Sequence, residues 1–339
     1  MEQSKLPMIE LHLHLDGAIP PETMWALAQE KGVPMPAETL EGFQHWLVET
    51  SDCADVNTYL ARFELPLQLM QDAPSIARVT KDLMTELSRQ GHIYDEIRFA
   101  PQLHRREGLT QRQAIEAVLE GRRQALAENP GYDAGILLCA MCIGPETVNM
   151  AENLETVRLA KEFLGRGVVG ADLAGAEGIV PLQSFHPVFD LARELGVPAT
   201  CHAGDSQGPD TVRDALSFGV RRIGHGHHIY DEPSLWEPAI ARGVTLEICP
   251  TSNIQCHTQP SYHDHPAKKL LDAGLRICIS TDNMTLAAVS LQDEYCHCVQ
   301  EMGFTQADLG KMLVFAAEAA FLPEEKKQKL VARVKEALS

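Results

Sequence analysis

The residues in this sequence that are best suited to chemistry are four histidines and one aspartate. They are His12, His14, His202, His225 and Asp282. Each lies at or near the end of a short apolar run, and in a parallel α/β barrel the carboxyl ends of the strands meet at one mouth. The first two are two positions apart, so on a strand both imidazoles point to the same face and can approach one ion. Leaving His225 aside, the three imidazoles and the carboxylate form a donor set that suits zinc and leaves room for a water molecule.

The elements that must position these residues are about eight short apolar runs rich in β-branched residues. They span residues 8–15, 93–100, 134–141, 168–175, 196–203, 221–228, 243–250 and 274–281. Polar loops and helix-like stretches separate the runs, which predicts an α/β fold, specifically a (β/α)8 TIM barrel. A doubly wound open sheet is the alternative. Roughly residues 21–90 predict a helical insertion after the first strand that forms a lid over one barrel mouth.

Length and composition favour one large globular domain. The 339 residues are 45% hydrophobic and 22% charged, and no linker or repeat divides them, so we expect a single domain over 1–339. The net charge of -18 argues against nucleic acid and against an anionic membrane surface as partners. No apolar run is long enough to span a membrane and the N-terminus lacks signal-peptide features, so we expect a cytoplasmic protein. The odd number of cysteines, nine, favours reduced thiols.

Two motifs point to other chemistry. Residues 165–170 spell GxGxxG, but this segment precedes a strand, whereas a dinucleotide fingerprint follows one. Residues 204–208 spell GxSxG between a strand and a helix-like stretch, which is the setting of a nucleophile elbow. A serine hydrolase that uses Ser206 is therefore the competing hypothesis. It leaves the paired histidines near residue 12 unexplained, and no HGGG-like oxyanion motif accompanies it.

Six short motifs in order resemble those of the adenosine deaminase family, in the amidohydrolase superfamily. They are HLHLDGA from His12, DLAGAE from Asp172, CHAGD from Cys201, RIGHG from Arg222, EICPTSN from Glu247 and TDN from Thr281. The resemblance covers nearly the whole chain. It implies one Zn²⁺ per chain on His12, His14, His202 and Asp282. It also implies hydrolytic deamination of adenosine and 2'-deoxyadenosine to inosine and 2'-deoxyinosine, with release of ammonia, in purine salvage.

The resemblance further implies roles for the catalytic residues. Asp205 would protonate N1 of the purine, His225 would orient or activate the attacking water, and Asp282 would accept a proton as well as bind the metal. Such chemistry uses the lowered pKa of a zinc-bound water.

Four residues are implied to bind the substrate, a small purine nucleoside. His14 would lie against it, and Asp16 would accept a hydrogen bond from the ribose 5'-hydroxyl. The backbone N–H of Gly175 would meet N3, and Asn283 would donate to N7. An aspartate at position 16 favours nucleosides over the free base.

Two positions depart from the family pattern. Ala176 stands where aspartate is usual, and Asp205 stands where the family has glutamate. The shorter carboxylate reaches about 1.5 Å less far. Deamination of adenine or of a modified aminopurine nucleoside therefore remains an alternative, as does a weakly catalytic nucleoside-binding protein. The sequence leaves the oligomeric state open.

Overall fold

Eight parallel strands form the centre of the computed structural model, which describes residues 6–53, 56–145 and 147–339. The strands are β1 Met8–His14, β2 His92–Phe99, β3 Asp133–Cys142, β4 Val168–Gly175, β5 His202–Ala203, β6 Arg222–His225, β7 Thr245–Ile248 and β8 Arg276–Ile279. Each of the eight apolar runs overlaps one of these strands. The predicted α/β fold is therefore confirmed.

The strands pair in sequence order as two four-stranded sheets, β1 to β4 and β5 to β8. Two isolated parallel bridges join the sheets, one between Ala171 and Ala199 and one between Leu13 and Asp282. The second bridge brings the end of the first strand beside the residues that follow the last one. The order of the strands and both junctions are those of a (β/α)8 barrel whose ladders are interrupted at two seams.

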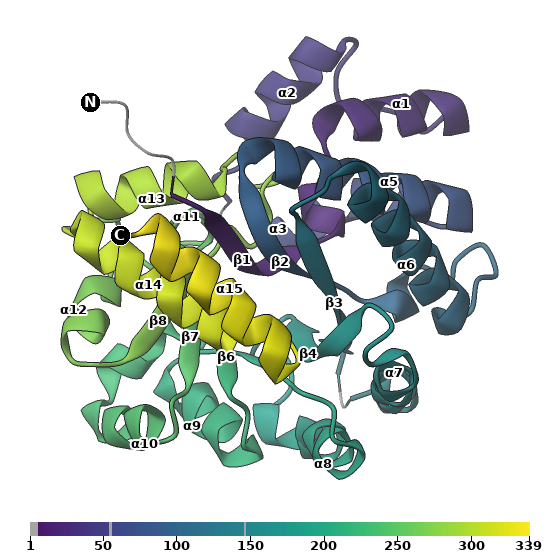
Figure 1. Ribbon diagram of the computed structural model, residues 1–339. Helices are drawn as coiled ribbons and strands as arrows, with labels where there is room; N and C mark the ends of the chain where they lie inside the picture. The colour runs from purple at the N-terminus through teal and green to yellow at the C-terminus, as the bar shows by residue number, and fades with distance from the viewer. Residues whose placement is uncertain (1–5, 54–55, 146) are drawn as a thin grey trace.

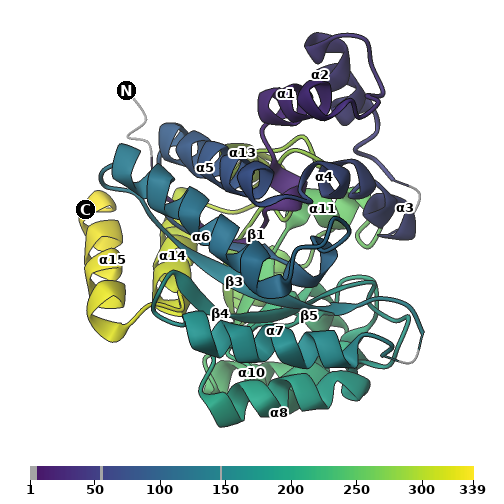
Figure 2. The same cartoon turned by 90° about the vertical axis from the view of Figure 1, so that its right-hand side faces the viewer.

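Helices surround the strands (Figures 1 and 2). Among the described residues, five lie between β1 and β2, namely α1 Pro21–Lys31, α2 Leu40–Glu49, α3 Val56–Ala61, α4 Glu64–Leu69 and α5 Ala73–Gln90. The later ones are α6 Gln111–Glu128, α7 Met150–Phe163, α8 His186–Leu195, α9 Pro209–Phe218, α10 Trp236–Ala241, α11 Pro250–Gln255, α12 Ala267–Asp272, α13 Leu291–Gln300, α14 Gln306–Ala319 and α15 Glu324–Ala337. The helical insertion expected at about residues 21–90 thus contains α1 to α5.

Local sequence signals set the bounds of the helices that frame the barrel. Helix α5 begins at the cap residue Asp72, whose carboxylate accepts the N–H of Ser75, and it ends at Gly91, which has a φ of 102°. Helix α6 packs along α5, and Gly121 allows this approach because a Cβ there would lie 2.3 Å from the carbonyl oxygen of Ala77. The two helices are therefore closely packed against each other on the β1 and β2 side of the barrel.

The interior of the barrel is not purely apolar. Every residue of β2 is buried, and these include the charged side chains of Asp95, Glu96 and Arg98. Burial of charge is costly unless the groups are paired, so these residues must find partners on other strands. No disulfide joins the cysteines of the described residues, and eight of the nine are buried. No helix among the described residues is long and apolar enough to cross a membrane.

Candidate metal centre and active site

The structure brings together the four side chains that the sequence proposed as metal ligands. Ligand atoms of His12, His14, His202 and Asp282 all lie within 4.8 Å of one another. Nε2 of His14 is 3.3 Å from Nε2 of His202, and Oδ1 of Asp282 is 3.4 Å from Nε2 of both His12 and His14. Lone pairs packed this closely without a proton between each pair repel one another, and a shared cation relieves that repulsion. The donor set fits a divalent ion of the zinc kind.

Two further carboxylates orient the imidazoles. Nδ1 of His12 lies 2.8 Å from Oε2 of Glu247, and Nδ1 of His202 lies 3.0 Å from Oδ2 of Asp172. Each contact places a proton on Nδ1 and leaves Nε2 with its lone pair facing the cluster. Nε2 of His12 is buried and has no hydrogen-bond partner in the described part of the chain. The free nitrogen is what a metal ligand requires.

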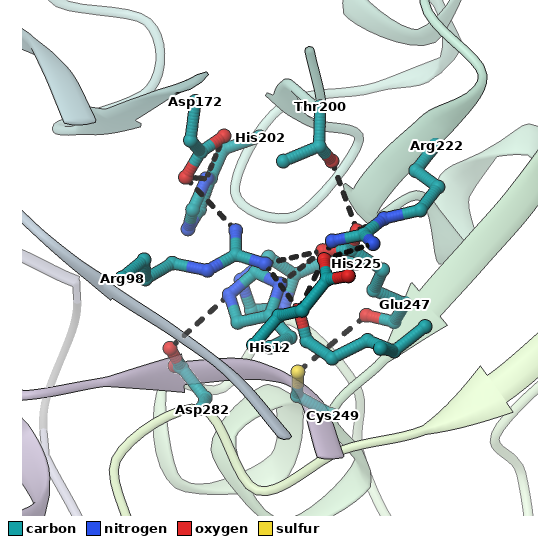
Figure 3. A network of polar contacts seen from close by, with 12 residues as sticks. His12, Arg98, Asp172, Thr200, His202, Arg222, His225, Glu247, Cys249 and Asp282 are labelled. Atoms are coloured by element: carbon teal, nitrogen blue, oxygen red, sulfur yellow. Dashed lines mark hydrogen bonds and ion pairs between the residues drawn. The ribbon is translucent and has the colours of Figure 1, made fainter. Parts of the chain in front are cut away.

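Arg98 joins these two carboxylates. Its guanidinium donates to Oδ2 of Asp172 at 2.8 Å and to Oε2 of Glu247 at 2.7 Å, and all three side chains are fully buried. Figure 3 shows Arg98 between the two acids, with the imidazoles alongside. On the far side, Arg222 donates to Oε1 of Glu247 at 2.6 Å and ion-pairs with Glu96. One continuous network of charge therefore lies beneath the proposed metal ligands.

The electrostatic field of this cluster shifts the pKa values of its members. Burial, with the positive charge of Arg98, lowers the pKa of His12 to about 4. Burial alone would raise the pKa of Asp282, but the imidazoles of His12 and His14 hold it well below its usual range. Burial would lower the pKa of His202, but the carboxylate of Asp172 raises it above the ordinary value. Neutral imidazoles and an ionised carboxylate are the forms that bind metal, so the shifts at His12 and Asp282 favour binding, whereas the raised pKa of His202 means that a metal has to displace a proton there.

Two site residues have unusual backbone conformations. His225, at the end of β6, has a φ of 58°, and Asp282, after β8, has a φ of 63°. Residues other than glycine seldom adopt this left-handed region, and such strain gathers at functional sites. The side chain of Asp282 is held by Ser252, whose hydroxyl donates to Oδ2 at 2.7 Å. Both strand ends thus depart from regular geometry where the predicted chemistry takes place.

Asp205 lies on the loop between β5 and α9, which one carboxylate organises. Glu177 accepts the backbone N–H groups of residues 204–207 at 2.7 to 3.1 Å and the hydroxyl of Thr211 at 2.6 Å. The side chain of Asp205 points toward His225, with 3.5 Å between Oδ1 and Nδ1. The structure therefore brings the proposed proton donor beside the residue proposed to orient the water.

The residues proposed to bind the substrate lie around the same strand ends. Gly175 ends β4 with a φ of 109°, and a Cβ there would lie 2.4 Å from the carbonyl oxygen of Cys142. Asn283 is buried against Gly17, where a Cβ would lie 1.9 Å from Oδ1 of the asparagine. Burial raises the pKa of the neighbouring Asp16 to about 6. The aromatic ring of Phe63 lies 6.4 Å from that of His14, between their centroids.

Ser206 is not arranged as a nucleophile. Its hydroxyl contacts only Glu177 among the described residues, at 3.4 Å from both a backbone and a side-chain oxygen. A serine hydrolase needs a histidine at that hydroxyl. The geometry does not favour that hypothesis.

Several residues of the site had no assigned role in the sequence prediction. Arg98, Arg222 and Glu247 carry the buried network. Asn253 contacts the proposed catalytic residues Asp205 and His225, and His265 contacts Asn253. The sequence did contain a signal for Arg98, Arg222 and Glu247, since charged residues inside otherwise apolar strands need buried partners.

A second possible donor set for a metal, His12 with His225 and Cys249, shares His12 with the first. It contains no carboxylate, so the first set has the better charge balance for a divalent cation.

The fold is a barrel of parallel strands, and its strand ends bring together a donor set that could hold a divalent cation, an arrangement typical of metal-dependent hydrolases. Solved structures agree with this architecture. An adenine deaminase from Arthrobacter aurescens has a TM-score of 0.87 at 22% identity and covers 98% of this chain and 99% of its own. An amidohydrolase with bound zinc, from Burkholderia ambifaria, has a TM-score of 0.86 at 23% identity, with 98% and 92% covered.

More specifically, the chain belongs to the adenosine deaminase family, whose pattern it matches over residues 7–337. An adenosine deaminase from Haemophilus ducreyi is 38% identical, with 97% of this chain and 96% of that protein covered. One from Clostridium perfringens is 37% identical, with 97% and 98% covered. An N6-mAMP deaminase from Arabidopsis, at 26% identity and a TM-score of 0.85, covers 98% of both chains. The predicted family and enzyme class are confirmed.

Proposed function

We propose that this protein deaminates adenosine and 2'-deoxyadenosine by hydrolysis, with one Zn²⁺ per chain. The observation that carries the proposal is the convergence of three imidazoles and a carboxylate at the strand ends, together with full-length similarity to proteins named adenosine deaminase. The ion would be held by His12, His14, His202 and Asp282. When bound, it would supply Lewis-acid activation of water at neutral pH.

The protein's own residues would move the protons. A water oxygen adds to C6 of the purine while the Asp282 carboxylate takes a proton from that water. The protonated carboxyl of Asp205 donates to N1, so negative charge does not build up on the ring. Asp282 then returns its proton to the C6 amino nitrogen, the C6–N bond breaks and ammonia leaves. The proton of the new C6 hydroxyl passes to the Asp205 carboxylate, so the 6-oxo nucleoside remains and both acids are restored. His225 lies beside Asp205 and close to the ligand imidazoles, from where it would orient the water.

The remaining residues would fix the nucleoside. The backbone N–H of Gly175 would meet N3, and Asn283 would donate to N7 while staying neutral. Asp16 would accept the ribose 5'-hydroxyl; a buried carboxylate at this place favours a neutral 5'-hydroxyl over a phosphate, which would repel it. Helices α3 and α4, near Phe63, would form the lid over the bound base.

The direct test uses purified protein loaded with zinc and a chelated control. Adenosine, 2'-deoxyadenosine, adenine and an N6-methylated adenosine are compared by loss of adenine-ring absorbance and by release of the amine. We expect turnover of the two unmodified nucleosides that stops on chelation and returns with added zinc. Preference for adenine or for the N6-methylated nucleoside would replace the proposed substrate, and no turnover with zinc bound would reject the activity.

A further inference from the structure

A backbone contact decides which ring nitrogen of His265, in the loop before α12, carries a proton. It is buried, and its Nδ1 accepts the backbone N–H of Ala267 at 3.1 Å. A backbone N–H can only donate, so Nδ1 carries no proton. Burial, with the neighbouring imidazoles of His228 and His225, lowers the pKa of His265 to about 3. His265 is therefore neutral, and its one ring proton is on Nε2.

The proton on Nε2 of His265 fixes the orientation of the side-chain amide of Asn253, on α11. Nε2 of His265 lies 3.2 Å from Oδ1 of Asn253, so the imidazole donates and the amide oxygen accepts. Asn253 is itself completely buried, which leaves its NH2 group to find partners within the protein. The orientation of an asparagine amide is ordinarily ambiguous, but here the chain of donors that begins at Ala267 decides it.

The NH2 group of Asn253 reaches two proposed catalytic residues. It donates to Oδ1 of Asp205 at 2.7 Å and lies 3.1 Å from Nδ1 of His225. Because an NH2 group cannot accept, Nδ1 of His225 must accept and carries no proton. The ring proton of a neutral His225 is then on Nε2.

We propose that His265 and Asn253 are positioning residues that hold the Asp205 carboxylate in place and keep His225 in its Nε2–H form. This inference rests on the proposed deaminase function. It assigns His225 a specific part in that reaction: with a proton already on Nε2, this nitrogen donates a hydrogen bond to the attacking oxygen and does not remove its proton. Asp282 is then left as the proton acceptor.

The arrangement also accounts for an aspartate at position 205. Glu177 fixes the backbone of this loop, and the hydroxyl of Thr258 lies 3.2 Å from the same Oδ1 that Asn253 holds. Among the described residues, Oδ2 of Asp205 has no hydrogen-bond partner. One oxygen is thus anchored and the other remains for the purine. A short side chain held from both ends has few rotamers to lose on binding.

The test compares variants of the full-length, zinc-loaded protein with adenosine as the probe. Asn253→Ala removes both donors to the catalytic pair. His265→Leu removes the donor to Asn253, whereas His265→Gln restores an N–H near the position of Nε2. His263→Leu, at an exposed histidine of the same loop, is the matched control. Because a misplaced catalytic group costs on the order of 10²-fold, we expect kcat to fall about tenfold to a hundredfold in N253A and H265L, with KM changed less than about threefold.

In the same series, H265Q should recover most of the lost kcat, and H263L should match the wild type. Zinc content is measured for each variant, so that loss of metal is told apart from loss of positioning. Wild-type kcat in both N253A and H265L would overturn the proposal, as would H265Q as slow as H265L.

The ring tautomers give a readout that does not need activity. NMR spectra of protein labelled with ¹⁵N-histidine report which nitrogen of His225 and His265 carries the proton. The signals are assigned from variants that each lack one histidine. We expect Nε2–H on both rings in the wild type, and a mixed His225 signal in N253A. A wild-type His225 protonated on Nδ1 would reject the proposal. If the wild type turns over no nucleoside, the proposed function fails, and the tautomers still decide the positioning.

Discussion

Nδ1 of His12 lies 2.8 Å from Oε2 of Glu247, and this contact decides which nitrogen of His12 faces the neighbouring imidazoles. The same carboxylate oxygen accepts a hydrogen bond from Arg98 at 2.7 Å. Arg98 thereby links the orientation of His12 to that of His202, which Asp172 holds in the same way. The proposed metal ligands thus depend on residues that do not themselves reach the ion.

Removal of the Arg98 charge should destabilise the whole barrel. Arg98→Met leaves Asp172 and Glu247 buried with fewer cationic partners, and loss of one member of a buried ion pair costs about 3–5 kcal/mol. Urea unfolding of the metal-free protein should show a loss of that size. Arg89→Met, at an exposed surface ion pair, should leave the free energy of unfolding nearly unchanged. Equal losses of unfolding free energy in R98M and R89M would contradict a stabilising role for the buried Arg98 charge.

Asp205→Asn should separate proton transfer from binding. The asparagine keeps an oxygen that can accept from Asn253, but it cannot donate a carboxyl proton to N1. We expect kcat to fall about 10²–10⁴-fold, with zinc content unchanged. Asp210→Asn, at an exposed carboxylate at the start of α9, is the control and should retain wild-type kcat. A D205N enzyme within about threefold of the wild type would mean that another group supplies the proton.

Gly17→Ala should act on the substrate through Asn283. The added Cβ would lie 1.9 Å from Oδ1 of the asparagine and would displace its side chain. Loss of one hydrogen bond to the purine costs about 1 kcal/mol, so we expect KM to rise roughly fivefold to tenfold. Asn283→Ala should have a similar effect, and the double variant should be little worse than either single one. If the increases in KM of the two single variants are fully additive in the double variant, Gly17 does not act through Asn283.

A buried acid outside the proposed metal cluster makes stability depend on pH. Glu294, on α13, accepts the N–H of Thr251 at 3.0 Å, and burial raises its pKa from the ordinary 4.5 to about 8. The folded state therefore retains a proton that the unfolded chain releases. The stability that this proton gives is fully present below about pH 4.5 and is lost as the pH rises through about 8, at about 1.4 kcal/mol per pH unit.

Glu294→Gln tests this dependence because the amide keeps an oxygen for Thr251 and does not ionise. Urea unfolding at about pH 5 and about pH 9 should show a smaller decrease in the free energy of unfolding for E294Q than for the wild type. Glu325→Gln, at a highly exposed side chain, should follow the wild type. If the free energy of unfolding changes with pH by the same amount in E294Q and in the wild type, Glu294 is ionised in the folded protein.

The strands and the proposed metal ligands were predictable from the sequence because apolar runs and the geometry of strand ends are local properties. The run 196–203 forms only the two-residue strand β5, although its backbone does lie along β4. Pro198 has no N–H to give to a ladder, and its carbonyl accepts from Ala171 at 2.9 Å while Thr200 donates back to Ala171 at 3.0 Å. A proline inside an apolar run was the signal for this shortening.

The contacts between distant residues were not predictable in the same way. Asn253 contacts Asp205, 48 residues earlier in the chain, and Arg98 contacts Glu247, 149 residues later. Hydrophobic periodicity does not report which buried charges face each other across a barrel. His265 lies in a polar stretch of the sequence, yet it is buried and contacts Asn253, because a polar sequence around a histidine does not exclude burial by the fold.

The two seams between the sheets have a consequence for how the protein assembles. His12 and His14 belong to the sheet of β1 to β4, whereas His202 and Asp282 belong to the half of the chain that contains β5 to β8. Neither half of the chain carries more than two of the four proposed ligands, so neither alone would offer a complete coordination shell. Tight binding of the proposed ion would therefore have to follow the joining of the halves, and the ion would then link the beginning of the chain to its end. Metal loading would be a late step of folding, open only to molecules whose two halves have met in the correct register.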